Sequence, residues 1–167
     1  MTAIVPWIAT SLPAWEIVVR LTASVFCGLL IGLDREWKHK PAGIRTHMLV
    51  CLAATTFTIL AMELYVVTER GDGTSSADPV RIIEAVTAGV AFLGAGSIIR
   101  SGADVQGMTT GASIWLAGAI GVACGAGYYV LAVINVALAL IILTVLGYIA
   151  YRLQKAAARS EGNGTPG

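Results

Sequence analysis

The chain has 167 residues, of which 56% are hydrophobic and only 13% are charged, with a mean hydropathy of +0.77. Because soluble domains carry about 25% charged residues, this composition excludes an ordinary water-soluble globule and predicts a protein embedded in the lipid bilayer. The net charge of +1 excludes the concentrated basic face that nucleic-acid binding requires. Cys27, Cys51 and Cys124 are widely spaced in apolar runs, which argues against a disulfide framework or a zinc site.

Residues 1–13 are apolar but shorter than the roughly 20 residues that cross a bilayer, so we expect an interfacial stub. No Lys or Arg precedes Arg20, so this segment lacks the basic start of a secretory signal. Residues 14–151 then form one transmembrane domain, followed by a basic, disordered cytoplasmic tail at 152–167. The expected membrane spans are about 14–33, 46–67, 80–99, 108–125 and 128–148.

These five spans predict an all-α integral membrane protein with its two ends on opposite sides of the membrane. Eight Lys and Arg residues outside the spans fall on one side, in the connection 34–47, at Arg100 and in the tail. Only Arg70 and Arg81 fall on the other side. Since basic residues are retained in the cytoplasm, we predict that the N-terminus is outside and the C-terminus inside.

Small residues line several spans, as expected where helices approach closely in lipid. The glycines predicted to make such contacts are Gly28, Gly32, Gly89, Gly94, Gly96, Gly111, Gly118 and Gly125. There are more of these small-residue faces than contacts among the five helices of one chain require. We therefore expect a homodimer or a larger homo-oligomer in the bilayer.

The connection 34–47 is the densest group of charged residues and holds both histidines. Positive-inside topology and a Glu36–Lys40 pair would account for much of this charge. Acidic and basic residues directly at the end of an apolar helix also indicate a fixed network with a functional or assembly role. Its candidate members are Asp34, Arg35, Glu36, Arg45, His47 and Arg100.

For a metal, Asp34, Glu36 and Asp104 are weak candidates, because Mg²⁺ prefers carboxylate oxygens and retained waters but basic residues surround these three. We expect no resident cofactor, with Mg²⁺ the one ion considered. Glu84, a carboxylate inside a span, either serves a transport function or pairs with Arg81 three residues earlier. No nucleophile elbow, phosphate loop or Cys–His–carboxylate cluster indicates an enzyme.

The chain carries three ordered motifs, namely Leu30–Trp37 continued by Lys40–His47, Gly89–Gly96, and Gly107–Trp115 ending at Gly121–Gly125. Together these motifs resemble the signature of the MgtC/SapB family. The resemblance implies a bacterial inner-membrane protein of about five spans, associated with growth under magnesium limitation and, in pathogens, with survival inside host cells. Many relatives continue into a C-terminal soluble domain, so this chain resembles the membrane domain alone.

Two functions remain open at this point. A permease needs polar groups along a path, whereas the deep span interiors offer only Asn135, threonines and small residues. This favours a regulatory module that binds another inner-membrane protein. The alternative is a small oligomeric transporter of Mg²⁺ or another ion or solute.

Overall fold

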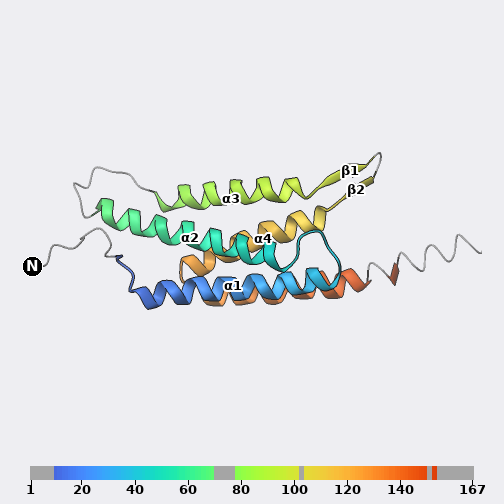
Figure 1. Ribbon diagram of the computed structural model, residues 1–167, viewed down its shortest axis with the longest axis horizontal. Helices are drawn as coiled ribbons and strands as arrows, with labels where there is room; N and C mark the ends of the chain where they lie inside the picture. The colour runs from blue at the N-terminus through green and yellow to red at the C-terminus, as the bar shows by residue number, and fades with distance from the viewer. Residues whose placement is uncertain (1–9, 70–77, 102–103, 150–151, 154–167) are drawn as a thin grey trace, which may run out of the picture.

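The computed structural model describes residues 10–69, 78–101, 104–149 and 152–153. Over this part of the chain the protein is an elongated bundle of helices with one short hairpin (Figure 1). The elements are α1 (Ala14–Trp37), α2 (Ile44–Glu69), α3 (Pro79–Gly96), β1 (Ile99–Ser101), β2 (Asp104–Gln106), α4 (Met108–Gly125), α5 (Tyr129–Ile141) and the π-helix η1 (Ile142–Leu146).

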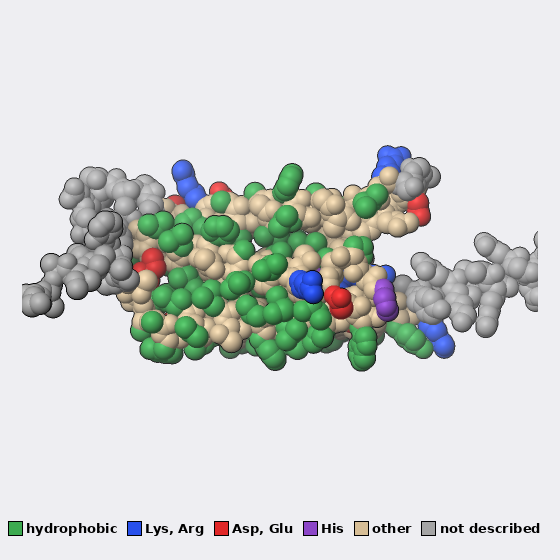
Figure 2. Space-filling view, in the orientation of Figure 1, with side chains coloured by type: hydrophobic (Ala, Val, Ile, Leu, Met, Phe, Trp, Pro, Cys, Tyr) green, Lys and Arg blue, Asp and Glu red, His purple; other side chains and the backbone are tan. Residues whose placement is uncertain are grey.

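The helices confirm the all-α membrane class. Within the described residues, four helices are long and apolar enough to cross a bilayer, namely Ala14–Trp37, Ile44–Val66, Met108–Gly125 and Tyr129–Ile149. The fifth helix, α3, runs alongside them, and the chain enters and leaves the bundle at opposite ends (Figure 1). Figure 2 shows hydrophobic side chains along the visible face and charged ones mainly toward its two ends, as expected for a surface in lipid.

The first connection is shorter than predicted. Residues 34–37 continue α1 and α2 begins at Ile44, so only Lys38–Gly43 links the two helices. Arg35 and Glu36 are good helix formers, and the first helix breaker is Pro41. His39 takes a positive φ of 51° where the chain leaves α1.

The segment between the third and fourth spans also differs from the prediction. The third helix ends at Gly96 rather than at residue 99, and the chain between the third and fourth predicted spans contains an antiparallel hairpin. Its pairs are Ile99 with Gln106, Arg100 with Val105, and Ser101 with Asp104. Most of the predicted N-terminal stub (residues 1–9) and of the tail (residues 154–167) lie outside the described residues.

Glycines hold α1, α2 and α4 against one another. A Cβ on Gly28 would lie 2.7 Å from the His47 carbonyl oxygen of α2, and one on Gly32 only 2.5 Å from the Ile44 Cα. On α4, a Cβ on Gly125 would lie 2.7 Å from the Thr58 Cβ. No larger residue fits at these points without separating the helices, so the predicted close packing is present within the chain.

The third helix makes fewer such contacts. Gly94 of α3 and Gly111 of α4 face each other, and a Cβ on Gly111 would lie 2.8 Å from the Gly94 carbonyl oxygen. Gly118 lies against Val90 in the same way. Nothing lies within 4 Å of a Cβ built on Gly89 or on Gly96. Two of the eight predicted packing glycines are therefore open in the described chain.

Candidate functional site: the charged junction of α1 and α2

The junction is built on the last turns of α1. Asp34, Arg35 and Glu36 are consecutive on a helix, where each residue turns by about 100° relative to the one before it. Their side chains therefore point three different ways. Arg35 reaches α4, Asp34 reaches the π-helix η1, and Glu36 reaches the start of α2.

Arg35 is buried at 3% exposure. Its Nη2 donates to Thr110 Oγ1 of α4 at 2.8 Å, and its Nε is buried with no partner among the described residues. A buried guanidinium with an unused donor is costly, so its position must be enforced by the packing around it. Arg35 thus acts inside the bundle and presents no surface to a partner.

Asp34 links α1 to the last helix. Its carboxylate pairs with Lys38 at 2.6 Å and accepts from Thr144 Oγ1 at 3.0 Å. The Lys38 ammonium also donates to the Leu143 carbonyl oxygen at 2.8 Å. The two residues together join the C-terminal end of α1 to η1, a segment of π-helix of the kind that often marks functional positions.

Glu36 closes the connection between α1 and α2. Its Oε2 accepts from the backbone N–H of Ile44, the first residue of α2, at 3.1 Å. A negative charge at a helix N-terminus is stabilised by the helix dipole and satisfies an otherwise free donor. The Glu36–Lys40 pair offered as the simpler explanation is absent, since the ion pairs among the described residues are Glu16–Arg20 and Asp34–Lys38.

His47 is completely buried where α2 meets α4. Its Nδ1 lies 2.8 Å from the Gly43 carbonyl oxygen and its Nε2 lies 3.1 Å from Ser113 Oγ. Because a carbonyl oxygen only accepts, Nδ1 carries a proton, and a neutral ring then accepts at Nε2 from the Ser113 hydroxyl. That hydroxyl also lies 2.8 Å from the Thr110 carbonyl oxygen, so its one proton serves one acceptor at a time.

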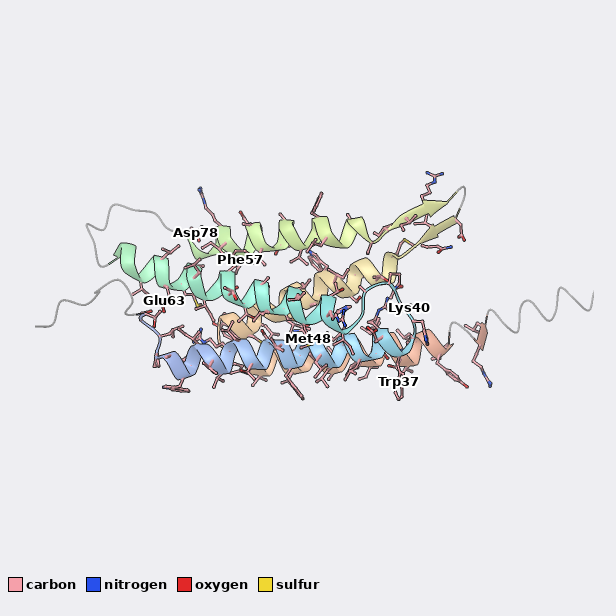
Figure 3. The ribbon with its side chains drawn as sticks, viewed as in Figure 1. Trp37, Lys40, Met48, Phe57, Glu63 and Asp78 are labelled. Atoms are coloured by element: carbon pink, nitrogen blue, oxygen red, sulfur yellow. The ribbon has the colours of Figure 1, made fainter. Side chains whose placement is uncertain are left out.

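The remaining predicted members do not join this cluster. Arg45 is exposed on the first turn of α2, and Arg100 is exposed on β1. Figure 3 shows Trp37 and Lys40 at the junction end of the bundle, with Glu63 and Asp78 at the opposite end. The network that the structure brings together is therefore Asp34, Arg35, Glu36 and His47, with partners on α4, η1 and the connection.

The predicted acidic positions are dispersed. Glu84 is exposed on α3 and forms no ion pair with Arg81 in the described chain, so the local pairing considered as one alternative is absent there. Asp104 is exposed on β2. Within the described residues no group of three or more His, Cys, Asp and Glu side chains is placed to hold a metal ion. Asp34, Glu36 and Asp104 do not form such a group.

The sequence reasoning missed the partners that complete the junction. They are Lys38, Thr110, Ser113, Leu143 and Thr144. Thr110 and Ser113 sit three residues apart in the Gly107–Trp115 motif, on one face of an apolar helix. The three-residue spacing of these two hydroxyl groups was the signal in the sequence that could have identified them. Leu143 contributes only its backbone carbonyl, so its side chain gave no signal.

At the opposite end, Arg20 joins α1 to the end of α4. It pairs with Glu16 one turn earlier on α1, and its Nη1 donates to the Gly125 carbonyl oxygen at 2.6 Å. A cation at a helix C-terminus satisfies a free carbonyl and complements the helix dipole. Arg20 near the start of α1 and Arg35 near its end thus each bind α4.

The fold and the junction define an α-helical integral membrane protein with charges concentrated at the ends of its helices. The model of the MgtC family matches residues 21–152, and this chain belongs to that family. It is 38% identical to Protein MgtC of Salmonella typhimurium over 112 residues, which cover 67% of this chain and 44% of that protein. It is 35% identical over 139 residues to a protein of Escherichia coli K12 named "Putative magnesium transporter YhiD", covering 83% of this chain and 64% of that one.

Protein MgtC of Brucella abortus is 38% identical over 107 residues, which cover 64% of this chain and 41% of that protein. The match thus spans less than half of each MgtC protein and under two thirds of YhiD. No solved structure matches the chain.

Proposed function

We propose that this protein is an inner-membrane regulatory module, linked to adaptation to low magnesium, that binds another membrane protein and neither transports an ion nor catalyses a reaction. Membership of the MgtC family and the name of the E. coli relative support the link to magnesium. The choice between regulation and transport rests on the interior of the bundle.

The observation that carries the proposal is that the polar side chains of the spans form hydrogen bonds with backbone carbonyls of the bundle. Thr55 and Cys51 donate to backbone carbonyls of α4, and Thr58 donates to a carbonyl of its own helix. Asn135 likewise donates to the carbonyl of Leu131. Thr55 and Cys51 therefore hold α2 to α4, and Thr58 and Asn135 are bonded within their own helices, whereas a transport path needs polar groups that face a passing ion.

The groove between α2 and α3 also favours regulation over transport. It has a volume of about 360 Å³ and is lined by aliphatic, alanine and glycine residues together with Phe57. Mg²⁺ sheds its water reluctantly and would find no side-chain oxygen ligand among these residues. Such a surface suits lipid or another apolar helix.

A partner would meet the protein at its predicted cytoplasmic end. His39, Lys40 and Arg45, here called the basic rim, are exposed there, beside a Trp37 that is 90% exposed. An acidic surface on the cytoplasmic side of a membrane partner complements this rim. Arg35 is buried, so the rim is the part of the junction available for contact.

Purified protein in liposomes loaded with a Mg²⁺-sensitive dye tests transport. We expect no protein-dependent flux in either direction of the gradient. Flux that is lost in Glu84→Ala but retained in Glu63→Ala, a control at the same end of the bundle that shares its charge, would establish the transporter alternative.

Growth in low magnesium tests the regulatory role. In a strain that depends on this protein for such growth, Arg45→Glu is expected to lose function while the protein is made at normal levels. Arg81→Glu, a matched reversal at the other end of the bundle, should retain growth. Equal growth of both variants would show that the basic rim is not needed for the regulatory role.

A further inference from the structure

The first turn of α4 has no side-chain cap. Its N-cap residue is Gly107, which has no side chain, so the hydrogen bond that usually satisfies a free N–H group at a helix start is missing. Gly107 has a φ of 87°, and a Cβ there would collide with the Ser97 carbonyl oxygen, so no capping residue fits. Met108 and Thr109 are exposed. The positive end of the dipole of this 18-residue helix therefore lies at the surface of the bundle.

Arg35 brings a buried positive charge to the same turn. Its side chain is 3% exposed, and its Nη2 donates at 2.8 Å to the hydroxyl of Thr110, the third residue of α4. That is the one hydrogen bond of the guanidinium in the described chain, although the group has five N–H donors and its Nε is buried without a partner. Figure 1 shows the start of α4 at the foot of the hairpin, at the same end of the bundle as the connection between α1 and α2. A buried cation and the positive end of a helix thus lie together with donors unused.

No carboxylate of the described chain forms an ion pair with this arginine. Asp34 attracts the guanidinium from the adjacent position on α1, but its carboxylate is bound to Lys38 and Thr144. Asp104 is exposed on β2. A guanidinium keeps its proton in proteins, so burying one without a contacting anion is costly, and the N-terminal end of a helix raises that cost for a cation. Both the arginine and the helix start would be stabilised by one small anion.

We propose that Arg35 and the first turn of α4 together bind a phosphate group, either a free phosphate ion or the head group of a phospholipid. The planar guanidinium matches two phosphate oxygens, and the free N–H groups at the helix start bind the others. A protein surface cannot reach the buried Arg35, whereas a phosphate group approaches along the exposed side of the turn, at Met108 and Thr109. This site does not depend on the regulatory role proposed above, and a growth or flux result leaves it unaffected.

Thermal unfolding of the full chain in a maltoside detergent, which contains no phosphorus, tests the ligand. The probes are inorganic phosphate and dihexanoyl phosphatidylglycerol, with dihexanoylglycerol as the matched lipid that lacks the phosphate. Because a ligand of the folded state raises the unfolding midpoint, we expect a saturable rise with a phosphate-bearing probe and none with dihexanoylglycerol. A rise with inorganic phosphate identifies a free anion as a ligand, and a rise with phosphatidylglycerol alone identifies a head group. No saturable rise with either probe would overturn the proposal.

Two substitutions test the site from its two sides. Arg35→Gln removes the buried charge and should weaken binding of the phosphate-bearing probe at least about tenfold. Because Arg35 also joins α1 to α4, Thr109→Asp provides a second test that leaves the interior unchanged. An acidic residue in the first turn is favourable for a helix, and its charge opposes a bound anion, so Thr109→Asp should also weaken binding at least about tenfold.

Arg45→Gln is the matched control. It lowers the net charge by one unit, as the other two substitutions do, but it removes an exposed arginine on the first turn of α2. Binding should equal that of the wild type. Unfolding of each variant without a probe checks that the helices remain folded. Unchanged binding by Thr109→Asp, or a loss in Arg45→Gln as large as in Thr109→Asp, would overturn the proposal, since the probe would then respond to surface charge in general.

Discussion

The α1–α2–α4 interior and the α3 face of the same bundle show how similar sequences reach different packing. Both regions are rich in small residues. A Cβ on Gly32 would lie 2.5 Å from the backbone of α2, whereas nothing lies within 4 Å of a Cβ on Gly89. A glycine in a membrane helix therefore indicates where close contact is allowed, and the arrangement of helices decides where it occurs.

The connections explain much of this difference. The six residues from Lys38 to Gly43 join α1 to α2, and Glu36 and His47 both bind the α2 end of that connection, at Ile44 and Gly43. A short, tied connection forces consecutive helices to lie side by side. The third helix is joined to α4 through the hairpin and contacts it near there through Gly94, while a groove of about 360 Å³ separates part of it from α2.

The largest expected effect separates the two kinds of glycine. Gly32→Leu should destabilise the folded protein by about 3 kcal/mol, since its side chain meets backbone that has no room to move. Gly89→Leu, at an open position, should change stability by less than about 0.5 kcal/mol. Reversible unfolding in mixed micelles measures both, and equal losses would mean that the two regions are packed alike.

A smaller effect is expected at the buried end of the junction. Thr110→Val removes the hydrogen-bond partner of the Arg35 Nη2 and should cost about 2 kcal/mol, because a buried charged donor is left unsatisfied. Thr109→Val is the matched control, since Thr109 is exposed on the same turn of α4. The same unfolding measurement applies, and a Thr110 variant as stable as the control would show that water replaces the hydroxyl.

The smallest effect is expected where the junction meets solvent. Lys38→Met breaks the ion pair to Asp34 and the bond to the Leu143 carbonyl, but the lysine side chain is 35% exposed. Solvent screening limits the loss to about 1 kcal/mol or less. Lys40→Met should have no measurable effect, and hydrogen exchange should show faster opening of residues 142–146 in the Lys38 variant alone.

At the charged junction, the sequence predicted the charged residues and the histidine but not the residues that bind them. Asp34, Arg35, Glu36 and His47 were identified because charges and a histidine at the end of an apolar helix are unusual. Their partners were not, since Thr110 lies 75 residues from Arg35 and Ser113 lies 66 residues from His47. Hydroxyl groups within an apolar helix carry no local sign of what they will bind.

The sequence by itself determined that the protein lies in the lipid bilayer and that its fold is all-α. Apolar segments near the thickness of a bilayer must form helices there, because lipid offers no partner for free backbone groups. Only the tertiary structure decided that Arg35 is buried while Arg45 is exposed, and that Gly28 is enclosed while Gly89 is open. A pattern along one helix specifies which residues share a face. Which neighbour that face meets depends on how all the helices cross, and that is a property of the whole bundle.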